Sequence, residues 1–181
     1  MFDWLKTKFH QKQLADRMRK HLATASGPPL HTGAIAVAMA ALEDDLVQAQ
    51  FQKLPVEQSK TFMMTCECIV MWAILRGIAS AEVPKPRQLG VALALRDHFS
   101  RHAVYVPDQF GRLWEETRRW MPELVKPSKD GNYYPAAALV QVPEAAGCRL
   151  GFVPDLIFGI HINETIASLT DIGRFAAQQE T

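Results

Sequence analysis

The chain has 181 residues, of which 48% are hydrophobic and 22% are charged, and this composition is typical of a globular protein that can bury a core. Its 20 Lys and Arg residues nearly balance its 19 Asp and Glu residues, so the net charge of +1 argues against general nucleic-acid binding. Three cysteines make no disulfide framework, and the charged N-terminus lacks the apolar run of a signal peptide. We therefore expect one cytoplasmic domain over residues 1–181.

The first predicted element is a basic amphipathic helix within residues 1–24, whose apolar residues fall on two faces. The residues of one face are Phe2, Leu5 and Phe9. Those of the other face are Trp4, Leu14, Met18 and Leu22. One face can pack on the core while the other meets a protein partner, a second copy or an anionic membrane surface. The predicted interaction surface comprises Phe2, Trp4, Leu5, Lys6, Lys8, Phe9 and Lys12.

A Pro- and Gly-containing break at 26–29 separates this helix from a second one, predicted over about 33–53 with Thr32 as its N-cap. The central helix follows over about 56–80, and between Phe62 and Ala79 it is apolar on nearly every side. Such a helix must be surrounded by protein or by lipid. Two charges inside the segment disfavour a membrane span, so we expect the centre of a helical bundle.

Two further helices are predicted over about 87–102 and 107–121, and five prolines then divide an irregular segment over 122–155. Residues 136–142 and 149–153 are each short enough to be strands, and 156–162 alternates like a strand before a helical pattern begins at Asn163. The predicted fold is therefore mainly α, a single-domain helical bundle around a buried central helix (about 56–80), with a short β-hairpin in 136–162 as an alternative for that segment.

Glu67 is the unusual residue of the central helix, because it projects among Met and Ile side chains. A buried carboxylate is unfavourable unless it is paired, and burial raises its pKa. We favour a structural pair with a His, Arg or Lys of a neighbouring helix. The alternative is a metal ligand or a proton-transfer residue.

His98 and His102 are four residues apart, so on one helix they face the same way and are able to hold a divalent metal. Glu67 and His161 are the candidate further ligands. The alternative for the two histidines is a structural role in the last helical turn, where a cationic ring favours the helix dipole.

Other polar and sulfur-containing residues are expected to be structural. Asp44 and Asp45 should be solvated, since consecutive helical positions point in different directions. Cys66 and Cys68 lie on different sides of a helix and should act as small buried hydrophobes. The basic residues around Tyr133 and Tyr134 suit an anionic ligand only weakly without a basic excess in the domain.

The chain contains no phosphate-binding loop and no nucleophile-elbow motif. The first functional hypothesis is therefore a non-enzymatic protein-interaction or regulatory module without a cofactor, acting through the N-terminal helix on a protein partner or in a homo-oligomer. The second is a metal-binding protein or metal-dependent enzyme that uses His98 and His102 with Glu67 or His161. The third is a peripheral membrane protein that binds through the N-terminal helix.

Overall fold

A computed structural model describes the backbone of residues 2–24, 26–126, 135–148, 150–151, 154 and 156–178, and their side chains except at 2–11, 156–157 and 173–178. Every regular element within these residues is a helix, so the predicted mainly α fold is confirmed. In chain order the elements are α1 (Phe2–Leu22), α2 (Pro29–Leu42), α3 (Asp45–Lys53), α4 (Val56–Ser80), α5 (Lys85–Phe99), α6 (Pro107–Leu124), the 3-10 helix η1 (Pro135–Ala137), α7 (Ala138–Ala145) and α8 (Leu156–Gln178).

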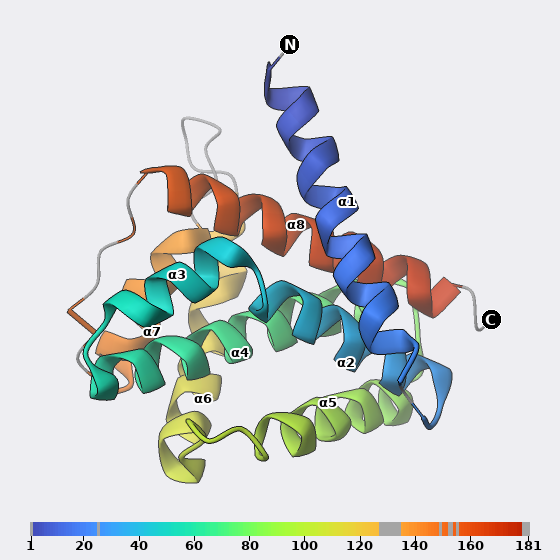
Figure 1. Cartoon of the computed structure of the whole chain (residues 1–181). Helices are drawn as coiled ribbons and strands as arrows, with labels where there is room; N and C mark the ends of the chain where they lie inside the picture. Colours follow the sequence, from blue (N-terminus) through green and yellow to red (C-terminus); the bar gives the residue numbers. More distant parts are fainter. Residues whose placement is uncertain are drawn as a thin grey trace.

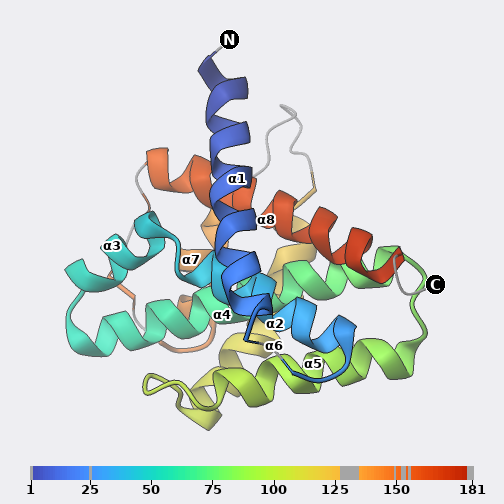
Figure 2. The ribbon, with the colours of Figure 1, turned by 45° about the vertical axis from the view of Figure 1, so that its right-hand side comes forward.

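Helix α4 is the centre of the bundle, as its sequence predicts. In Figures 1 and 2 it passes through the middle of the molecule, with α8 along one side and α5 along the other. Helices α2, α3, α6 and α7 also contact it. It is long and apolar enough to cross a membrane by length and composition, but 78% of its most apolar 18-residue window is buried inside the fold. In this structure its apolar surface is thus covered by protein.

Aromatic side chains join the long helices of the core. Phe62 of α4 lies 6.2 Å from Phe158 of α8, and Phe99 of α5 lies 6.4 Å from Phe110 of α6, both measured between ring centroids. All four rings are at most 1% exposed. Tilted aromatic pairs at these separations contribute more than their buried area alone. These contacts explain how α4, α5, α6 and α8 form one continuous core.

The predicted second helix, over about 33–53, is two helices in the structure. α2 ends at Leu42 and α3 begins at Asp45, with Asp44 between them in an extended conformation. Asp44 interrupts the helix because its side chain accepts a hydrogen bond from the Leu46 amide and so caps α3. The predicted cap at Thr32 is also wrong, since α2 begins at Pro29, in the position where proline loses no hydrogen bond.

The predicted β-hairpin within 136–162 is wrong where the structure describes it. Residues 135–145 form η1 and α7, and residues 156–162 are the start of α8. Phe158 and Ile162 are buried at helical spacing, whereas Ile160 between them is 50% exposed. The alternation of apolar residues was therefore misleading, because burial follows the helical period. Much of the other candidate strand, over 149–153, lies outside the described residues, as do residues 127–134 of the Pro-rich segment.

Leu169 and Ile160 form a matched pair on α8 for testing the core. Leu169 is completely buried and Ile160 is half exposed. We expect Leu169→Ala to lower the free energy of unfolding by about 2–5 kcal/mol, because it leaves a cavity against the bundle core. Ile160→Ala should lower it by about 0.5 kcal/mol or less. Urea unfolding followed by circular dichroism measures both, and equal losses would contradict this packing.

Candidate functional site

Glu67 has the partner that its sequence context demands. It lies on α4 with its side chain 0% exposed, and its Oε1 is 2.6 Å from Nδ1 of His102. The partner comes from the turn after α5, since that helix ends at Phe99, three residues earlier than predicted. The His102 amide donates to the Phe99 carbonyl at 2.9 Å, which fixes this turn. The expected structural pairing of Glu67 with a neighbouring element is thus found, and it involves His102.

The surroundings of Glu67 favour its neutral form. Burial raises the pKa of Glu67, and the hydrogen bond and charge of His102 offset that effect only in part. Its other oxygen, Oε2, is buried without a hydrogen-bond partner among the described residues. The neighbours Cys66 and Cys68 are buried free thiols, as expected. Burial, and then the nearby Glu67, raises the pKa of both thiols well above the ordinary range. Glu67, hydrogen-bonded to His102, is therefore a titratable group inside an apolar core.

His98 lies beside this pair but does not join it. Its ring is 5.3 Å from that of His102, edge to face, and its Nε2 is 3.0 Å from Sδ of Met39 on α2. Burial lowers the pKa of His98, and the positive charges of His102, Arg101 and His21 add to this effect. A neutral imidazole against a thioether suits this position.

The structure brings three of the four predicted metal ligands together and separates the fourth. Glu67, His98 and His102 are neighbours, whereas His161 belongs to a different network on α8. In the part of the chain that the structure describes, no three His, Cys, Asp or Glu side chains are placed to hold one metal ion. The metal site therefore remains a sequence prediction, and the described geometry does not supply a third ligand for it.

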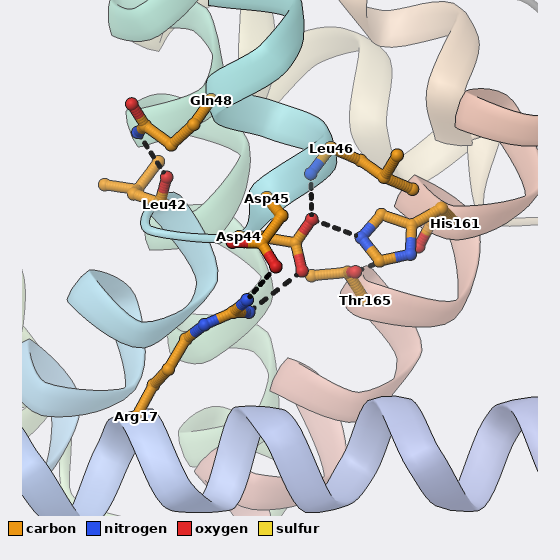
Figure 3. A network of polar contacts seen from close by, with 8 residues as sticks. All are labelled: Arg17, Leu42, Asp44, Asp45, Leu46, Gln48, His161 and Thr165. Carbon is orange, nitrogen blue, oxygen red and sulfur yellow. Dashed lines mark hydrogen bonds and ion pairs between the residues drawn. The ribbon is translucent and has the colours of Figure 1, made fainter.

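Asp44 is the centre of a second polar cluster, drawn in Figure 3. Its Oδ1 is 2.8 Å from Nε2 of His161 and accepts from the Leu46 amide at 3.0 Å, while its Oδ2 is 3.0 Å from Nη1 of Arg17. The cluster therefore connects α1, α3 and α8. Asp44 is 4% exposed, so the prediction that it is solvated was wrong. Asp45 fits that prediction, because its side chain is 86% exposed, although one of its oxygens lies 3.3 Å from the Arg17 guanidinium.

Strong partners keep Asp44 ionised. Burial acts to raise its pKa, but the hydrogen bond and charge of His161, together with Arg17 and the Leu46 amide, hold the pKa of Asp44 well below its usual range. A second contact of α1 joins Nε2 of His21 to Oε2 of Glu43, the residue that follows α2, at 2.9 Å. The C-terminal half of α1 is thus fixed to the junction of α2 and α3.

The sequence contained only part of the signal for this cluster. An Asp followed by an acidic first turn is a helix-start pattern, so Asp44 was recognisable as a cap. Nothing local indicated that Arg17, 27 residues earlier, and His161, 117 residues later, would meet it. Such pairings arise only when distant elements pack.

The predicted interaction surface is described only in part. Lys12 is exposed on α1. The side chains of Phe2, Trp4, Leu5, Lys6, Lys8 and Phe9 lie outside the described residues. The same holds for Tyr133 and Tyr134.

Comparison with known proteins gives no further constraint. No protein-family model, curated protein or solved structure matches the chain.

The raised pKa of Glu67 predicts a pH-dependent difference between the wild type and Glu67→Gln. The unfolded chain loses the Glu67 proton at a lower pH than the folded chain, so the wild type loses stability as pH rises above about 4 towards neutrality. Gln stays neutral, so its stability relative to the wild type should improve as pH rises over this range. Urea titrations from acid to neutral pH measure it.

Glu57→Gln is the matched control for that experiment, because Glu57 lies on the same helix with its side chain 85% exposed. Solvent screens an exposed charge, so this substitution should change the free energy of unfolding by about 0.5 kcal/mol or less. A difference between Glu67→Gln and the wild type that does not change with pH would contradict the prediction.

The Asp44 cluster predicts a large effect of removing one charge. Asn retains the cap on α3, but Asp44→Asn removes the charge that faces Arg17 and His161, and should lower the free energy of unfolding by about 2–3 kcal/mol at pH 7. Because the pKa of Asp44 is depressed, this stabilisation is present above about pH 4 and declines as pH falls further. Asp45→Asn should cost about 0.5 kcal/mol or less. Equal effects in urea unfolding would contradict the assignment.

Proposed function

We propose that the protein is an interaction module that self-associates through α1. The observation that carries this proposal is the difference between the two faces of α1, of which one packs on the core and the other is exposed. Leu14 is 3% exposed and Met18 packs against the core, so the side of α1 that bears them faces the protein's own body. Lys12, Asp16 and Lys20, on the other side, are exposed.

Three of the apolar residues near the start of α1 fall on this outer side by helical periodicity, whereas Trp4 falls on the side of Leu14 and Met18. Helical periodicity places positions 2, 5 and 9 in line with the exposed positions 12 and 16, roughly half a turn from Leu14 and Met18. We call the positions 2, 5, 9, 12 and 16 the outer stripe. Its first three residues are Phe, Leu and Phe at spacings of three and four, the pattern of a seam between two helices.

The course of α1 supports the same proposal. In both Figures 1 and 2 its N-terminal half extends beyond the other helices of the body. A short helical segment without packing partners is marginally stable in water, so covering the apolar part of the outer stripe stabilises it. The ion pairs of Arg17 and the contact of His21 hold the C-terminal half of α1 on the body of the protein.

A second copy of the chain is the occupant that we favour. The net charge of +1 gives little overall repulsion between copies, and an identical helix offers the matching seam. An interfacial membrane helix needs a single broad apolar face, whereas the apolar residues of α1 are divided between two faces, one of which is used by the core.

Sedimentation equilibrium of the wild type and of two matched double variants tests the proposal. We expect a dimer for the wild type and a dissociation constant raised at least about 100-fold by Leu5→Glu with Phe9→Glu, because two charges enter an apolar seam. Thr7→Glu with Gln11→Glu adds the same charge at the same spacing on the other side of the helix, and should dimerise like the wild type.

Three outcomes would overturn the proposal. They are a monomeric wild type at high micromolar concentration, equal effects of the two double variants, and binding to anionic vesicles that only Leu5→Glu with Phe9→Glu abolishes while the protein stays monomeric.

A further inference from the structure

A groove of about 450 Å³ lies on the surface between α4 and the end of α6, away from the sites described so far. Its apolar lining includes the indole rings of Trp72 and Trp114 and the side chain of Val125. Its cationic lining consists of Arg76, Arg118 and Lys126, and no acidic residue lines it among the described residues. Its volume is in the range of small-molecule sites.

The aromatic part of the groove is rigidly held. Trp72 and Trp114 are partly buried and pack against the core cluster, so their remaining surface is presented by a fixed scaffold. The indole N–H of the nearby Trp120 donates to Glu116 at 3.2 Å. The indole N–H groups of Trp72 and Trp114 have no hydrogen-bond partner among the described residues. These two rings therefore offer both flat apolar surface and donors.

The cations of the groove are available to a ligand. The Arg76 guanidinium lies 5.2 Å from the Trp72 ring centroid, a stacking distance, and has no carboxylate partner among the described residues. Arg118 and Lys126 form ion pairs with Glu115 and Glu123 respectively, and all four of these side chains are more than half exposed. Exposed pairs of this kind are weak, so a bound anion is able to compete for both cations.

We propose that this groove binds a small organic anion that carries a flat aromatic ring, such as an aryl carboxylate, sulfonate or phosphate. The ring packs on Trp72 and Trp114, and the anionic group meets Arg76. Arg118 and Lys126 supply further positive charge to the groove. The occupant follows from charge complementarity with three cations and from the stacking surface of two indoles.

Titration with naphthalene-2-sulfonate, with naphthalene-2-methanol as its neutral counterpart, tests this site. The indole N–H signals in a ¹H–¹⁵N spectrum report binding, after assignment with Trp72→Phe and Trp114→Phe variants. We expect saturable shifts of both signals with the sulfonate, an affinity about tenfold lower or worse for the neutral compound, and no shift of the Trp120 signal.

Arg76→Gln should weaken binding of the sulfonate about tenfold, whereas Arg112→Gln, an exposed arginine of α6 outside the groove, should leave it unchanged. Arg76 is exposed, so its variant should unfold at the wild-type urea concentration. The proposal is overturned if the signals of Trp72 and Trp114 do not saturate, if the neutral compound binds equally well, or if the two arginine variants behave alike.

Discussion

The fold depends on the need to cover a helix that is apolar on nearly every side between Phe62 and Ala79. Over this stretch α4 has little polar surface to turn to water, so its neighbours must surround it, and in the described part of the chain α2, α3, α5, α6, α7 and α8 contact it. The one charged residue buried within it then has to be satisfied from outside the helix. The turn after α5 provides His102 for Glu67, so the position of that turn follows from the chemistry of α4.

The two buried carboxyl groups, of Glu67 and Asp44, connect neighbouring elements in different ways. Glu67 is nearly isolated in an apolar core and has one hydrogen-bond partner, so its proton is held more tightly. Asp44 is surrounded by donors from three elements, so its charge is favoured. The first arrangement produces a carboxyl group in the core whose protonation responds to pH. The second makes a permanent charge that ties together residues as far apart in sequence as Arg17 and His161.

Local patterns were sufficient for the elements whose periodicity is unbroken. The bounds of α4 and the burial of the two cysteines beside Glu67 were both readable from the sequence. The break at Asp44 and the helical form of residues 156–162 were not, because a cap and a short apolar alternation each fit two structures. The partners of Glu67 and Asp44 could be expected as chemical types but not as residues, since sequence separation carries no information about which elements meet. The groove of Trp72 and Trp114 was missed for the same reason.

The placement of the thiols beside Glu67 has a consequence for handling and damage of the protein. Cys66 is 5% exposed and Cys68 is fully buried, and both thiols hold their protons tightly. Alkylating agents and peroxides attack the thiolate at a reachable sulfur, so the folded chain resists them at these two positions. Their modification requires α4 to be uncovered. The rate at which these two cysteines are labelled therefore reports how readily the core opens. Mass spectrometry measures this rate, and no probe residue has to be introduced into the sequence.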